Sequence, residues 1–241
     1  MAEQRTAPAA RGTVDWRRRV ALSFAVAVAV LVLLPYAIAP FYRFVDPVSV
    51  PILWRRATGQ RVERTFEPLG DISPALQLAV IVAEDGSFCR NPGIDLGAIR
   101  DVLRRFDDRA RLARGASTIT QQTAKNLFLW QGRSYLRKAL EVPLALWLNL
   151  VLPKRRVLEI YLNIAQWGPN GEFGAEAGAH YAFGKSSRDL DAREAAALAA
   201  VLPNPVQRSA RQPGPLVRRL TSLYTRRADE LAGREACVRA P

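Results

Sequence analysis

The stretch ASTITQQTAKN, residues 116–126, has the spacing of a helix with one polar face that no obvious structural need explains. With Ser117 as the N-cap and about 100° of rotation per residue, four polar side chains share a stripe about 100° wide. The stripe consists of Thr118, Gln121, Gln122 and Lys125, and the opposite side carries Ile119, Thr120, Thr123, Ala124 and Leu127. Hydroxyls, amides and one ammonium suit a polar, anionic ligand. The stretch therefore predicts a ligand-binding helix.

The N-terminal region predicts a membrane anchor with a cytoplasmic tail. The run from Val20 to Tyr42 contains 23 uncharged residues, and a membrane-spanning helix needs about 20. A cleaved signal peptide is the alternative, because residues 37–39 resemble a cleavage site, but its apolar region has only about 7–15 residues. Five arginines and two acids precede the run, and such an excess of positive charge marks the cytoplasmic side. We expect a tail at 1–19 and a transmembrane helix at 20–42.

Charge and cysteine content narrow the function classes. The net charge is +13, and most of it lies after the apolar run. A basic domain outside the cytoplasm favours an anionic membrane surface or an anionic substrate carried by a lipid. Nucleic acid is the usual partner of such charge, but the expected topology excludes it. Two cysteines cannot form a zinc site, a haem site or a disulfide framework. Cys89 and Cys237 could pair in an oxidising compartment, and the sequence leaves this open.

The remaining residues predict a mainly helical domain between a linker and a tail. We expect a juxtamembrane linker with short extended pieces at 43–64, the domain at 65–210 and a basic tail with one solvated helix at 211–241. Helices are expected at 74–86, 95–106, 117–129, 134–151, 153–163, 175–183 and 194–202, with a charged loop at 107–115. A capping box of Asp191 and Glu194 begins the last of these helices. Few stretches alternate with the period of a strand.

Glu84 and Asp85 are candidate acid–base residues because they close an apolar helix. A carboxylate at such a boundary can be partly desolvated, which raises its pKa toward general acid–base work. A solvated helix end is the alternative interpretation. However, two acids at a helix C-terminus oppose the helix dipole, which favours a functional reason for them.

Arg137, Lys138 and Glu141 share one face of the helix expected at 134–151. They could form surface ion pairs worth about 0.3–0.5 kcal/mol each. They could equally form a basic clamp for phosphate with a second carboxylate beside it. The spacing does not decide between these interpretations. His180, the only histidine, has no spacing typical of a triad or a metal site, so we interpret it as structural.

Taken together, these residues resemble the peptidoglycan glycosyltransferases, the lysozyme-like family 51. EDGSFCRNPGID at 84–95 is similar to the family's first motif, Glu-Asp-x-x-Phe-x-x-His-x-Gly. RGASTITQQTAKNL at 114–127 is similar to the second, Gly-Gly-Ser-Thr-x-Thr-Gln-Gln-x-x-Lys-Asn. The stretches RKALE at 137–141, KRRVLEIYLN at 154–163, 167–185 and 190–199 follow in family order, so the likeness covers roughly 65–205. Because the chain leaves no room for a transpeptidase domain, it resembles the monofunctional biosynthetic members.

The resemblance implies a lysozyme-like fold and an enzyme that polymerises lipid II into β-1,4-linked glycan strands, releasing undecaprenyl diphosphate. Glu84 matches the catalytic base and Glu141 the second glutamate, near the diphosphate. The implied substrate-binding residues are Asp85, Phe88, Ser117, Thr118, Gln121, Gln122, Lys125, Asn126, Arg137 and Lys138. No cofactor or protein metal site is implied with certainty, although a divalent cation near the diphosphate is an option. The implied partners are lipid II, the nascent strand, inner-membrane lipid and cell-wall synthesis proteins, with the catalytic domain in the periplasm.

One departure from the family pattern is Asn91, which stands where the first motif has His. Loss of the histidine could weaken local packing or the positioning of the acceptor, but both glutamates remain. Two alternative functions stay open at this point. A lytic transglycosylase would need one acidic glutamate and no diphosphate clamp. A non-catalytic membrane-anchored scaffold of cell-wall synthesis would need neither a catalytic glutamate nor a diphosphate clamp.

Overall fold

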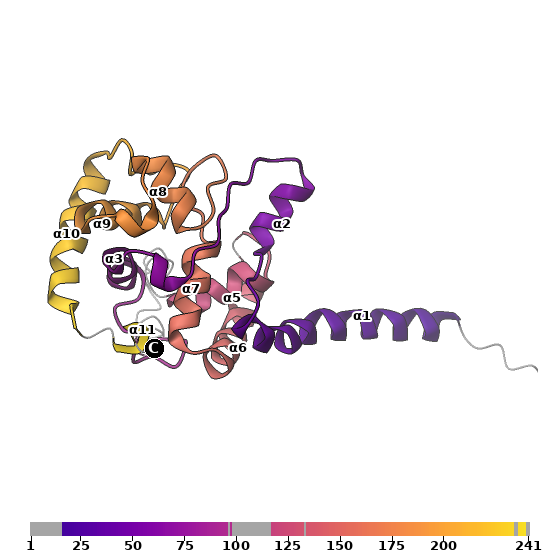
Figure 1. Ribbon diagram of the computed structural model, residues 1–241. Coiled ribbons are helices and arrows are strands. Elements are labelled where there is room, and N and C mark those ends of the chain that lie inside the picture. Colours follow the sequence, from indigo (N-terminus) through magenta and orange to yellow (C-terminus); the bar gives the residue numbers. More distant parts are fainter. Residues whose placement is uncertain (1–15, 96, 98–116, 133, 234–235, 240–241) are drawn as a thin grey trace, which may run out of the picture. The chain divides into compact units, whose positions relative to one another are not determined.

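The computed structural model describes residues 16–95, 97, 117–132, 134–233 and 236–239 (Figure 1). The chain divides into two units, residues 1–38 and 39–241. Within the described ranges the regular structure is helical, apart from isolated bridges that join Glu63 to Glu172 and Gln166 to Phe173. This confirms the predicted mainly helical class. The helix expected at 95–106 and the loop expected at 107–115 lie almost entirely outside the described residues.

The first unit contains α1 (Trp16–Ile38), an apolar helix of 23 residues. The segment Trp16–Arg43 has a mean hydropathy of 2.5 in its most apolar window, and none of that window is buried. Such a helix is long and apolar enough to cross a bilayer. The expected N-terminal apolar helix is thereby confirmed, whereas its orientation stays a prediction.

One half of the second unit forms around α9 (Ala192–Val201), which packs against α3 (Pro74–Glu84) and α10 (Pro215–Leu231) (Figure 1). Every residue of α9 from Ala195 to Val201 is buried. Five of these seven residues are alanines, which allow neighbouring helices to approach closely. The expected capping box of Asp191 and Glu194 begins this helix.

The other half joins α5 (Ile119–Phe128), α6 (Tyr135–Val151) and α7 (Lys154–Ile164). α8 (Ala175–Phe183) contacts α7 and α9, and therefore connects the two halves. On α5, the predicted apolar side is buried throughout, including Thr120 and Thr123. Because this side of α5 is buried, its polar side is the one that faces the candidate site described below.

Two expectations for the segments that flank the domain are wrong. The linker contains a helix, α2 (Val50–Ala57), rather than only extended pieces. Its second residue is Pro51, and proline is favoured in the first helical turn because it needs no amide partner there. The tail does form a helix, α10, but it is not simply solvated. Val217, Thr221 and Tyr224 lie on one face of α10 and are buried against α9 and α3.

Candidate active site

The loop that follows α3 brings two helix ends together. We call residues 85–95 the motif loop. Asp85 Oδ2 accepts a hydrogen bond of 3.1 Å from the amide of Ile119, the first residue of α5. A carboxylate is stabilised at a helix N-terminus by the exposed amides and the helix dipole. Asp85 is unfavourable at the C-terminus of α3 but favourable at the N-terminus of α5. This second interaction explains why an acid occupies position 85.

Glu84, the last residue of α3, faces the polar side of α5. Its Oε2 accepts a hydrogen bond of 2.6 Å from Gln122 Nε2, and Gln122 Oε1 accepts one of 3.3 Å from the buried Tyr161 hydroxyl. Burial raises the pKa of Glu84, and the Gln122 bond and the positive charges of Lys125 and Arg208 partly oppose this. A carboxylate held in this way can accept a proton more readily than a solvated one.

The start of α5 differs from the expectation. Thr118, not Ser117, is the N-cap, and Thr118 and Gln121 form a capping box with reciprocal hydrogen bonds of 3.1 and 3.0 Å. Both residues are 2% exposed, and the Thr118 hydroxyl also donates to the carbonyl of Gly93 at 2.6 Å. The cap uses the hydroxyl of Thr118 and the Oε1 of Gln121, and the ligand roles predicted for both residues stay predictions. Gln122, Lys125 and Asn126 remain as the partly accessible polar residues of α5.

Lys125 lies among the charged residues that the sequence predicts for the site. Burial lowers its pKa, and the negative charges of Glu141 and Glu84 act against that shift. The positive charges of Arg137 and Lys138 act in the same direction as burial. Lys125 therefore lies within electrostatic range of the carboxylates of two motifs and of both cations of α6.

Arg137, Lys138 and Glu141 form a partly buried cluster in which the Lys138 side chain is still 45% exposed, so they are not a purely solvated set of surface ion pairs. The side chain of Glu141 is 3% exposed and that of Arg137 is 13% exposed. Glu141 pairs through one oxygen with Arg137 and through the other with Lys138 at 3.0 Å. Lys138 Nζ also donates to Ser117 Oγ at 2.7 Å, which links α6 to the residue before the α5 cap. Among the described residues, no group accepts a hydrogen bond from the buried Nε of Arg137.

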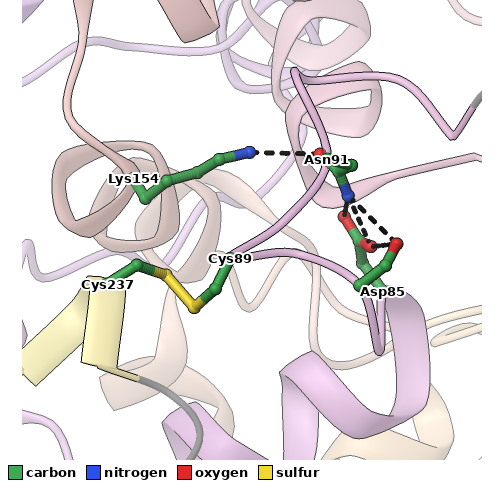
Figure 2. The surroundings of a disulfide bond; sticks show 6 residues. Asp85, Cys89, Asn91, Lys154 and Cys237 are labelled. Carbon is green, nitrogen blue, oxygen red and sulfur yellow. Dashed lines mark hydrogen bonds between the residues drawn. A yellow bond between two sulfur atoms is a disulfide. The ribbon is translucent and has the colours of Figure 1, made fainter.

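Asn91 occupies the centre of the motif loop (Figure 2). Its Nδ2 donates to both carboxylate oxygens of Asp85, at 2.9 and 3.0 Å. Its Oδ1 accepts from Lys154 Nζ at 3.1 Å and from the amide of Gly93 at 3.0 Å. Lys154, the first residue of α7, also lies 4.7 Å from the ring centre of Phe88. Burial lowers the pKa of Lys154 to about 8, against the opposing charge of Asp85.

Sequence reasoning missed the role of Lys154 in this network. A lysine at the N-terminus of a helix is unfavourable to the helix dipole, and this was the available signal. It also missed Arg208 and Tyr224, which lie close enough to Glu84 to interact with it electrostatically. Phe88 is completely buried beneath Lys154, so it supports the loop rather than presenting a free surface to a ligand.

A disulfide joins Cys89 of the motif loop to Cys237 of α11 (Ala236–Arg239), answering the question that the sequence left open (Figure 2). The two cysteines are 148 positions apart, and their Cα atoms are 5.5 Å apart. α11 also packs against α7, which carries Lys154. The end of the described chain thus holds the loop that contains the first motif.

Other potential sites are weaker. His180 is exposed and pairs with Glu176 at 2.9 Å on its own helix, in keeping with a structural role. Over the ranges that the structure describes, there is no group of three His, Cys, Asp or Glu side chains able to hold a metal ion.

Comparison with known proteins agrees with this arrangement. A family model described as Transglycosylase matches residues 53–229. A biosynthetic peptidoglycan transglycosylase from Nitrobacter hamburgensis is 57% identical over 84% of this chain and 89% of its own length. Proteins of the same name from Agrobacterium fabrum and Rhizobium meliloti are 47% and 43% identical. These alignments cover 86% and 96% of this chain and 92% and 99% of the relatives. The chain belongs to the transglycosylase family.

Proposed function

We propose that the chain is a peptidoglycan glycosyltransferase that polymerises lipid II into glycan strands during cell-wall synthesis. The observation that carries this proposal is that α5 links Glu84 to the cations of α6. Gln122 donates to Glu84 at 2.6 Å, and Ser117, directly before the helix cap, accepts from Lys138 Nζ at 2.7 Å. Lys125, on the same helix, is affected by the charges of Glu84 and Glu141. A proton-accepting carboxylate and a cluster of cations therefore share one site. Joining a sugar hydroxyl to a sugar diphosphate requires both.

Glu84 serves as the general base in this reaction. The 4-hydroxyl of the acceptor N-acetylglucosamine attacks C1 of the donor N-acetylmuramic acid, and the C1–O bond to the diphosphate breaks. The hydroxyl proton passes to Glu84, undecaprenyl diphosphate leaves, and inversion at C1 gives a β-1,4 link. The hydrogen bond from Gln122 at 2.6 Å holds the carboxylate in place. Burial raises the proton affinity of Glu84 in the same site.

Cations of α5 and α6 bind the leaving diphosphate. Lys125, Arg137 and Lys138 are the three candidates, and the unpartnered Nε of Arg137 offers a buried donor for an anionic oxygen. Glu141 positions Arg137 and Lys138 by pairing with both. Stabilising charge as it develops on a leaving group is a large contribution to catalysis. Ser117, Gln122 and Asn126 are the polar side chains nearby that could bind sugar or phosphate oxygens.

The residues around Glu141 do not form a good protein site for a divalent cation. Both oxygens of Glu141 are engaged by Arg137 and Lys138, so they are poor donors for a metal. In the described part of the chain no second and third carboxylate accompany Glu141. Mg²⁺ prefers oxygen ligands in octahedral geometry, which these residues do not provide on their own. The proposed mechanism uses the three cationic side chains alone.

α1 anchors the enzyme in the inner membrane in a single pass. The apolar window of this helix is entirely unburied, and arginines dominate the residues before it. The positive-inside rule then places the N-terminus in the cytoplasm and the catalytic domain in the periplasm. This location suits a lipid-borne substrate, and cell-wall synthesis proteins would be natural neighbours.

The two alternatives are less well supported. A lytic transglycosylase has no diphosphate to bind, so the buried pairing of Glu141 with two cations would serve no purpose. A scaffold without activity would not need to desolvate Glu84 and Lys125 together.

Incubation of the purified full chain with labelled lipid II separates these functions. A polymerase should give long glycan products and release one undecaprenyl diphosphate per bond formed. Preformed strands are offered in a parallel reaction, and shortening of those strands would indicate a lytic enzyme instead. No product from either substrate would favour the scaffold.

The pH dependence of polymerisation should report Glu84. A general base must be ionised, and protonation inactivates it as the pH falls. Because burial raises the pKa of Glu84, kcat/KM should begin to fall at a pH above the ordinary glutamate pKa of about 4.3 and then drop up to tenfold per pH unit. Rates of the wild type are measured from about pH 4 to about pH 8. An acid limb at or below the ordinary glutamate value would contradict the assignment.

A further inference from the structure

Asn91 is well suited to join Asp85 to Lys154 without adding a charge. Asp85 can only accept hydrogen bonds when ionised, and an ammonium can only donate. An amide offers donors on its nitrogen and an acceptor on its oxygen, so one orientation of Asn91 satisfies both neighbours. The structure has this orientation, with Nδ2 toward Asp85 and Oδ1 toward Lys154 (Figure 2).

Through α5, this bridge affects Glu84, the proposed general base. Asp85, held by Asn91, accepts the amide of Ile119 and so fixes the start of the helix. One turn into α5, Gln122 donates to Glu84. A shift of the Asp85 carboxylate would move the first turn of α5, and with it the donor that orients Glu84.

The motif loop is anchored on both sides of Asn91. Cys89 is bonded to Cys237, and Gly93 has a φ of +97°. A Cβ at Gly93 would lie 2.7 Å from the carbonyl oxygen of Ala145 and 2.9 Å from Asn149 Cβ. The loop therefore lies directly against α6 at this point. In the part of the chain that the structure describes, Asn91 is the one donor that reaches both oxygens of Asp85, whereas Ser87 Oγ and the Ile119 amide each donate to one, at 3.2 and 3.1 Å.

We propose that Asn91 is a positioning residue for the transferase reaction, acting on Glu84 through Asp85, Ile119 and Gln122. The kinetic test of this inference rests on the proposed function. Asn91 itself need not touch substrate. Because an amide does not titrate, Asn91 itself keeps the same form over the working pH range, which an imidazole at this position would not do.

Replacing Asn91 by Asp tests the bridge with an almost unchanged shape. The variant loses the donor and places a second carboxylate against Asp85. We expect kcat to fall by about 10–100-fold, because misplacement of reacting groups by about 1 Å can cost 100-fold. KM for lipid II should stay within about threefold. Asn170→Asp, an exposed amide in the 168–171 loop, is the matched control and should behave as wild type.

The exchange variant Asp85→Asn/Asn91→Asp provides the rescue. Asn at 85 can still accept from the Ile119 amide and can donate to Asp at 91, which in turn accepts from Lys154. We expect this double variant to recover at least about fivefold in kcat over Asn91→Asp. A folded exchange variant with no recovery would overturn the proposal, as would an Asn91→Asp variant with wild-type kcat.

Asn91→His adds a pH readout that a purely structural role would not produce. The charged groups around this position are Asp85, Lys154 and, through Ser87, Asp95. A neutral imidazole can bridge Asp85 and Lys154, but an imidazolium has no acceptor for Lys154. The variant should gain an additional acid limb near the histidine pKa of about 6.5. A pH profile identical to that of wild type would contradict the bridge.

Hydrogen exchange separates this inference from the proposed function. The Ile119 amide should exchange at least about tenfold faster in Asn91→Asp than in wild type, whether or not the chain polymerises lipid II. Unchanged exchange would overturn the positioning role even in an active enzyme. Fast exchange in a chain that makes no polymer would instead leave the bridge standing and reject the proposed reaction.

Discussion

Replacing Glu84 by Gln should lower kcat/KM for lipid II polymerisation by about 10²–10⁴-fold, the usual contribution of a positioned general base. Gln has nearly the same shape and can still accept the hydrogen bond from Gln122 Nε2. It cannot take the proton of the attacking hydroxyl. The loss should fall mainly on kcat, because the cations proposed to bind the diphosphate are unchanged.

Single-turnover rates with labelled lipid II measure this loss. Glu230→Gln, on the exposed side of α10, makes the same chemical change away from the site and should retain full activity. Circular dichroism checks that both variants are folded. Equal polymer from Glu84→Gln and wild type would reject Glu84 as the base.

Removing the disulfide should lower the free energy of unfolding by about 4–5 kcal/mol. Cys89 and Cys237 close a loop of 148 positions, and in the chain-entropy model a loop of about 100 residues already contributes about 4.7 kcal/mol. Typical domains are stable by only about 5–15 kcal/mol, so this is a large share of the total. Urea unfolding of Cys89→Ser/Cys237→Ser against wild type, in the same detergent, measures the difference.

A reductant provides the control for this prediction. Dithiothreitol should lower the stability of the wild type to that of the double variant and should leave the double variant unchanged. Alkylation of both cysteines in protein purified without reductant would show that the bond does not form. Equal urea midpoints with equal slopes would show that the bond does not stabilise the fold.

Features encoded within a few residues were predictable from the sequence. The apolar run before Tyr42, the mainly helical class and the buried side of α5 all follow from spacing and composition. The α5 cap was also within reach, since Thr118 and Gln121 fit the capping-box pattern of Thr followed three positions later by Gln. Ser117 has Thr120 at the corresponding position, which lacks a side chain able to complete the box.

Features that join distant segments were not predictable from spacing. Lys154 meets Asn91 across 63 positions and Tyr161 meets Gln122 across 39. Periodicity describes which side of one helix is buried, but not which other segment buries it. For the same reason, Arg137, Lys138 and Glu141 could be placed on one face from sequence, whereas the burial of Glu141 came only from the packing of α6.

The position of Cys237 imposes an order on the maturation of the enzyme. Ribosomes make the chain from its N-terminus, so the motif loop is synthesised long before the cysteine that secures it. Every other motif of the site lies between the two cysteines. The covalent bond can form only after all of these segments have been synthesised and the thiols have met an oxidant. Newly made molecules therefore pass through a stage in which all the proposed catalytic side chains have been synthesised but the loop carrying Asp85 is not yet covalently fixed.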